Sequence, residues 1–155
     1  MPAKSFFINH ARLILLLVLL LVIGALLSWG IAFKAQQDRD SRELSLRVTE
    51  AVFRHWQAQP LLEASHPSLR SQMTDAQWEN QVISMSVLGP LQEIESITGT
   101  SNMPLLPFLA EQLTYRYQIG LQFIYAPAVV DLRLLRANGQ WQITDFVVSS
   151  MLTNN

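Results

Sequence analysis

Two residues, His55 and Asp145, combine the type and position that catalytic chemistry would need. Asp145 interrupts an apolar run near the C-terminus, and His55 falls in the apolar stripe of a predicted helix. A carboxylate buried among apolar side chains is costly unless it takes up a proton or finds a donor. An imidazole and a carboxylate that face each other inside a domain are groups that can act as general acid and base. The candidate catalytic residues are therefore Asp145 and His55, with a structural hydrogen bond as the alternative role of Asp145.

The position of Asp145 depends on the register of a predicted hairpin. Asn138-Gly139 is typical of a two-residue type I′ turn between two strands. The cross-strand pairs would then be Arg136 with Trp141, Leu134 with Ile143, Leu132 with Asp145 and Val130 with Val147. In this register Asp145 lies on the apolar face. A bulge near Thr144 is the alternative, and it would move Asp145 to the solvent side and turn Phe146 and Val148 inward.

A binding pocket is a further interpretation of the same region. Its candidate ligand-binding residues are His55, Trp56, Trp141 and Asp145. The three histidines lie far apart in the sequence and there is no cysteine, so we expect no metal site. The sequence contains no glycine-rich phosphate loop and no G-x-S-x-G motif. We accordingly expect no cofactor, no nucleotide hydrolysis and no serine-hydrolase chemistry.

An apolar loop at residues 102–108 is the candidate for partner contact. It holds two prolines, which disfavour a central strand. The side chains expected to touch a partner or the membrane are Met103, Leu105, Leu106 and Phe108. A loop that folds back over the core is the alternative.

The elements that must position these residues begin with a predicted membrane span. Residues 13–33 carry no charge, and 21 helical residues reach about 30 Å, the thickness of a hydrocarbon core. Trp29 suits the headgroup zone, and Lys34 ends the apolar run with a charge. The lipid bilayer is thus an expected partner through residues 13–33. The alternative is a cleaved signal peptide, although its apolar region would be unusually long.

The distribution of charged residues bears on the orientation of the predicted span and on whether nucleic acid is a partner. The N-terminal tail, residues 1–12, contains Lys4 and Arg12, whereas four basic residues follow the span closely. Long domains translocate largely regardless of their charge, so we expect the tail to stay inside and the following domain to lie outside, at the inner (cytoplasmic) membrane with a periplasmic domain. All 12 acidic residues and all but two of the 11 basic ones lie from Lys34 onward. That balance offers no basic face for nucleic acid.

Helical signals follow the span. Residues 35–59 contain neither Gly nor Pro and carry an apolar stripe, and the all-polar first part, residues 34–43, predicts a solvated stalk. Pro60 ends this helix, and a short helical turn follows. Thr74 and Gln77 form a capping-box pattern that predicts a helix from about Asp75 to Val87.

After Gly89-Pro90 the apolar period changes from 3.6 to 2. Strands are predicted over residues 91–98, 113–123, 128–136 and 141–150. The fold class is therefore α+β: one N-terminal transmembrane helix, then two to three helices packed on a curved, cone-like antiparallel sheet of three to four strands. Residues 44–150 form one domain, and residues 151–155 a frayed terminus.

The sequence resembles the nuclear-transport-factor-2-like (cystatin-like cone) superfamily. The resemblance covers nearly all of residues 44–150. It rests on an opening helix that ends at Trp56, on the segment SLRSQMTDAQWENQV…LGPLQEIESITG and on the closing RLLRANGQWQITDFVVSS. In enzymes of this superfamily, such as ketosteroid isomerase, a strand aspartate in the cone is a general base, which is the role the resemblance implies for Asp145.

The layout of one N-terminal span carrying such a domain is similar to bitopic assembly components of bacterial secretion systems. This similarity implies a non-enzymatic module that binds envelope proteins or its own copy. A small-molecule or lipid-binding cone is the second hypothesis, and an isomerase- or dehydratase-like enzyme is the third. A filled core with an exposed apolar patch would favour the first, and an open cavity with converging polar groups would favour the others.

Overall fold

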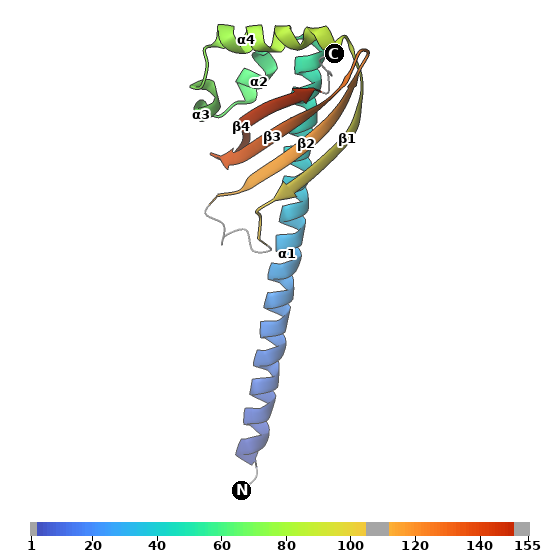
Figure 1. Ribbon diagram of the computed structural model, residues 1–155. Coiled ribbons are helices and arrows are strands. Elements are labelled where there is room, and N and C mark those ends of the chain that lie inside the picture. The colour runs from blue at the N-terminus through green and yellow to red at the C-terminus, as the bar shows by residue number, and fades with distance from the viewer. Residues whose placement is uncertain (1–2, 105–111, 151–155) are drawn as a thin grey trace.

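The chain begins with one continuous helix that is far longer than any other element. The computed structural model describes residues 3–104 and 112–150. Helix α1 (Ala3–His55) contains both the apolar run and the helix predicted to follow it, with no break between them. Figure 1 shows its N-terminal part extending well away from the rest of the molecule. Its large apolar side chains between residues 13 and 31 are exposed, from 43% at Leu27 to 73% at Leu21. This stretch is a candidate membrane span by its length and composition.

Short helices follow where prolines and a capping box predict them. Trp56 has a φ of 54°, and this left-handed residue ends α1. The helices α2 (Gln59–Ala64) and α3 (Pro67–Arg70) each carry a proline in their first turn. Helix α4 (Asp75–Ser84) begins at the predicted capping box of Thr74 and Gln77. A 3₁₀ turn, η1 (Met85–Leu88), then completes the predicted helical stretch.

The second half of the domain is an antiparallel sheet. Its strands are β1 (Leu91–Ser101), β2 (Thr114–Phe123), β3 (Pro127–Ala137) and β4 (Gln140–Ser150), paired in the order β1-β2-β3-β4. The α+β class and the four strands are confirmed. The sheet is open, with β1 and β4 at its edges (Figure 1), and the cone-like shape remains a prediction.

The C-terminal part of α1 packs across one face of the sheet. Val52 and Phe53 are fully buried there, against alternate residues of β2 and β3. The Phe53 ring centroid lies 5.5 Å from that of Phe123, 5.6 Å from Trp56 and 6.2 Å from Phe146. Aromatic side chains thus fill the space between helix and sheet that a ligand would occupy in the alternative, ligand-binding interpretation.

Polar residues of α1 also contact the sheet, which corrects the expectation of a solvated stalk at residues 34–43. Gln37, Ser41, Ser45 and Thr49 recur every fourth residue and are 4%, 0%, 0% and 0% exposed. Residues four apart share one helix face, and small side chains let a helix approach a neighbouring surface closely. Arg39 and Asp40, on other faces of the same turns, remain exposed. The segment is therefore part of the domain.

The β3–β4 hairpin decides where Asp145 lies. Asn138 and Gly139 have φ values of 52° and 78°, which confirms the type I′ turn. The first pairs, Arg136 with Trp141 and Leu134 with Ile143, are as predicted. A register shift then follows, so that Arg133 pairs with Asp145, Leu132 with Phe146 and Val130 with Val148. The predicted pairs of Leu132 with Asp145 and Val130 with Val147 are wrong, and the alternative of a bulge near Thr144 is confirmed.

Candidate functional site

Asp145 lies on the face of the sheet that points away from α1. Its carboxylate is 3.7 Å from Arg133 Nε, and the two side chains are 40% and 59% exposed. The bulge turns Phe146 inward instead, and this ring is 6% exposed. An exposed ion pair of this kind contributes little to stability. Asp145 therefore does not enter the core as the uninterrupted register predicted.

His55 is the last residue of α1, and its side chain is exposed. The buried face of α1 passes through Ser45, Thr49 and Val52, so it is rotated away from the stripe that the sequence suggested. The structure consequently does not bring His55 and Asp145 together. The prediction of a buried His55–Asp145 pair is wrong. Helix α1 turns small polar side chains such as Ser45 and Thr49 toward the sheet, and its histidine faces solvent.

The two tryptophans of the predicted pocket belong to different parts of the core. Trp56 stacks on Phe123, with 5.5 Å between the ring centroids. Trp141 meets Tyr115 edge to face at 5.0 Å. Both side chains are half-buried and serve as packing residues. They do not converge with His55 and Asp145 on one cavity.

Met103 is the one predicted partner-contact residue that the structure describes. It is 6% exposed, and its sulfur lies 3.9 Å from the Tyr115 hydroxyl. The side chain of Met103 therefore packs on the core, and the prediction that Met103 is an exposed contact is wrong. Leu105, Leu106 and Phe108 lie outside the described residues.

A hydrogen-bonded cluster that the sequence interpretation missed joins α1 to β2. The hydroxyls of Ser41 and Tyr117 share a hydrogen bond of 2.8 Å, and the Tyr117 hydroxyl also donates to the backbone oxygen of Asp38 at 3.3 Å. The Tyr115 hydroxyl donates to the Asp38 carboxylate. Burial raises the pKa of Tyr117 above its ordinary value of 10.0; the Ser41 hydrogen bond opposes this rise, and the Asp38 carboxylate adds to it. The four-residue spacing of Gln37, Ser41, Ser45 and Thr49 is the sequence signal from which this helix face could have been found.

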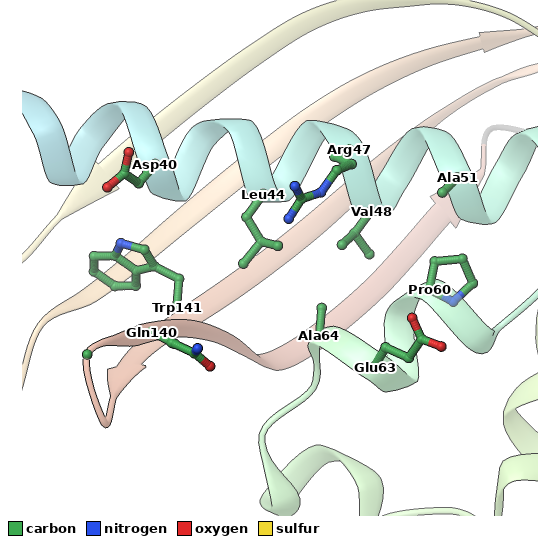
Figure 2. Close-up of a pocket in the computed structure, with 11 residues that line it drawn as sticks. Asp40, Leu44, Arg47, Val48, Ala51, Pro60, Glu63, Ala64, Gln140 and Trp141 are labelled. Carbon is green, nitrogen blue, oxygen red and sulfur yellow. The ribbon is translucent and has the colours of Figure 1, made fainter.

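A groove runs between α1, α2 and the β3–β4 hairpin. Its volume is about 660 Å³. Figure 2 shows Leu44 and Val48 projecting from α1 into the gap, with Trp141 on the hairpin side and Ala64 on the side of α2. Charged side chains also line the groove, namely Asp40, Arg47 and Glu63. The indole N–H of Trp141 is buried and has no hydrogen-bond partner among the described residues. Such a groove has the size and mixed polarity of a small-molecule or peptide site.

An exposed apolar cluster lies at the opposite end of the domain from the candidate span. We define the distal patch as Ile83, Val87, Ile124 and Tyr125, which are 49%, 62%, 51% and 73% exposed. Two backbone hydrogen bonds hold its parts together, from Tyr125 N–H to the Leu88 carbonyl at 3.1 Å and from Ile124 N–H to the Pro90 carbonyl at 3.2 Å. In Figure 1, α4 marks this end of the domain. Exposed apolar side chains that adjoin one another are typical of an interaction surface.

Two further results concern sites and relatives. No group of three or more metal-ligating side chains occurs among the side chains that the structure describes, those of residues 12–104 and 112–150. In comparisons with known proteins, no family model, no curated protein and no solved structure matches this chain. The resemblance to the nuclear-transport-factor-2-like superfamily therefore stays a prediction.

Proposed function

We propose that this chain is a single-pass membrane protein whose domain, residues 34–150, is a non-enzymatic protein-interaction module in the cell envelope. The exposed apolar stretch of α1 supports a span through the inner membrane. The basic tail residues Lys4 and Arg12 support an orientation with the domain outside the cytoplasm. Because α1 continues unbroken from the span into the core, a partner held by the domain would be fixed relative to the membrane.

The observation that carries this proposal is the distal patch. Four large apolar side chains are exposed at the membrane-distal end, while the interior between α1 and the sheet is filled by Phe53, Phe123 and Phe146. A filled core leaves the predicted cone without room for a substrate, and an exposed apolar cluster gains free energy when a second protein covers it. This combination favours binding of another envelope protein, or of a second copy, over catalysis.

In-cell cross-linking of full-length protein tests the proposal. After extraction in mild detergent, mass spectrometry identifies whatever is linked to the wild type in stoichiometric amounts. The Val87→Asp variant should lose that product, because a charge within a covered apolar patch is not solvated. Val147→Asp is the matched control, since Val147 is 48% exposed on β4, outside the patch. A product that survives Val87→Asp, or a wild type recovered only as a monomer, would contradict the proposal.

The orientation is tested by cysteine labelling, because the chain contains no cysteine of its own. Thr74 is exposed just before α4, so Thr74→Cys should react with a membrane-impermeant maleimide in spheroplasts. Ser5→Cys in the N-terminal tail should react only after the membrane is opened. The reverse pattern would place the domain in the cytoplasm.

The groove of Figure 2 favours a second candidate function, small-molecule binding. Its apolar wall of Leu44, Val48 and Trp141 is suited to an apolar ligand, and the charged side chains at its rim would favour a ligand with one polar end. Native mass spectrometry of full-length protein would show such a ligand as a retained mass. Ala51→Trp should fill the groove and remove that mass, whereas recovery of ligand-free wild type would count against this function.

A further inference from the structure

The sheet domain reaches down to the end of the candidate membrane span. Phe33 is the last residue of the uncharged run, and the guanidinium carbon of Arg136, near the end of β3, lies 5.4 Å from the centre of its ring. This is a cation–π contact between the sheet and the membrane end of the helix. Figure 1 shows the ends of β1 and β2 nearest the span lying beside α1. The domain is therefore set close against the bilayer surface, without an intervening linker.

A polar pocket lies at this level between α1 and the end of β1. Lys34, Asp38 and Arg42 line it from one face of the helix, since they are spaced four residues apart. Thr100, Ser101 and Tyr117 are among the residues that line its other walls. The volume is about 440 Å³. We name this cavity the juxtamembrane pocket.

The charges of the juxtamembrane pocket favour an anion. Asp38 already accepts a hydrogen bond from the Tyr115 hydroxyl. Among the described residues, neither Lys34 nor Arg42 has a carboxylate oxygen within 4.0 Å. The two cations and one carboxylate leave a net positive charge, with hydroxyl donors from Thr100 and Ser101 beside it. A phosphate group with a net negative charge is complementary to this set.

The position of the pocket relative to the bilayer indicates where the phosphate comes from. The rise of 1.5 Å per residue puts Arg42 roughly 12 Å above Lys34 along the helix. A headgroup layer is roughly 5–8 Å thick, so Lys34 lies within it and the long Arg42 side chain can reach down to it. The anions concentrated at that depth are lipid phosphates. We propose that the juxtamembrane pocket binds the headgroup of an anionic phospholipid through Lys34 and Arg42. This inference rests on the membrane span of the proposed function and is independent of any partner at the distal patch.

Native mass spectrometry of full-length protein, released from detergent micelles after addition of dioleoylphosphatidylglycerol, tests the site. The wild type should retain the lipid as a bound adduct. In the Lys34→Gln/Arg42→Gln double variant, half-saturation should need at least about tenfold more lipid, because each cation near a membrane surface contributes to lipid attraction. Arg39→Gln is the matched control: Arg39 is exposed on the same stretch of α1 and does not line the pocket. It should bind as the wild type does.

Three further measurements separate the possible outcomes. The Lys34→Arg/Arg42→Lys variant keeps both charges and should retain lipid, which distinguishes lost charge from lost folding. Inorganic phosphate should not displace the lipid at equal concentration, and complete displacement would show a site for free anions and overturn the lipid assignment. Equal lipid binding by the wild type and the Lys34→Gln/Arg42→Gln variant would also overturn the proposal. Extraction of the chain from membranes by alkaline carbonate would instead show that the membrane span itself is wrong.

Discussion

The Tyr117 side chain joins β2 to α1 through a 2.8 Å hydrogen bond to the buried hydroxyl of Ser41. Ser41 is 0% exposed, and Tyr117 is 5% exposed. The contact lies about two helical turns beyond Phe33, so it fixes the sheet to the helix at the end of the domain nearest the candidate span. A small side chain at position 41 leaves the room that the tyrosine ring needs.

Ser41→Leu should lower the stability of the domain by about 2–4 kcal/mol, because it overpacks the contact with Tyr117 and removes the hydrogen bond. Thermal unfolding of full-length protein in detergent, followed by circular dichroism, measures the loss. Arg39→Leu places the same side chain at an exposed position of the same helix and should change stability by no more than about 0.5 kcal/mol. Equal effects of the two variants would show that residue 41 is not packed against the sheet.

Gly99→Ala should destabilise the domain by about 1–3 kcal/mol through the same tyrosine. Gly99 lies opposite Tyr117 in the β1–β2 pairing, and the Tyr117 ring covers the place where a Cβ would stand. An alanine would push the ring away from Ser41. Gly24→Ala in α1 is the control, since nothing lies within 4 Å of its added Cβ. If both variants unfold at the wild-type temperature, the ring does not rest on Gly99.

The stability of the domain should fall as the pH rises above about 10, because Tyr117 has a raised pKa in the folded state. The unfolded chain loses this phenolic proton at lower pH than the folded chain does. The stabilisation is thus complete below the unfolded pKa of 10.0 and is lost as the pH increases toward the folded value. Urea unfolding at a series of alkaline pH values measures this slope.

The matched variants of this pH experiment are Tyr117→Phe and Tyr125→Phe. Tyr117→Phe should be less stable at neutral pH, by about 1 kcal/mol, and should show a flatter alkaline decline. Tyr125 is 73% exposed, so its replacement should leave the decline as it is in the wild type. A steep decline that persists in Tyr117→Phe would assign the alkaline transition to other groups.

Asp145→Asn should change the free energy of unfolding by no more than about 0.5 kcal/mol and so leave the urea midpoint nearly unchanged, because the Asp145–Arg133 ion pair is exposed. Phe146→Ala, one residue further along β4, should cost about 3–5 kcal/mol because that ring is buried beside Phe53. The contrast between the two variants tests the bulge directly. A large loss in Asp145→Asn would indicate an inward carboxylate and the uninterrupted register.

The sequence by itself determined the elements whose signals are local. The uncharged run at residues 13–33, the capping box of Thr74 and Gln77, and the Asn138-Gly139 turn each act over a few residues, and each appears as expected. The alternation of apolar and polar residues likewise predicted β2 and β3 closely. These features can be predicted without knowing which part of the chain each segment packs against.

Only the tertiary structure decided which faces meet. A bulge in β4 replaces Asp145 by Phe146 in the core, and one extra residue in a strand is invisible to a pattern of period two. The rotation of α1 was likewise settled by packing, because Ser41 and Ser45 are buried against the domain and Ser41 hydrogen-bonds the buried Tyr117 hydroxyl. The His55–Asp145 pair and the solvated stalk were wrong for this reason: both depended on faces that long-range contacts select.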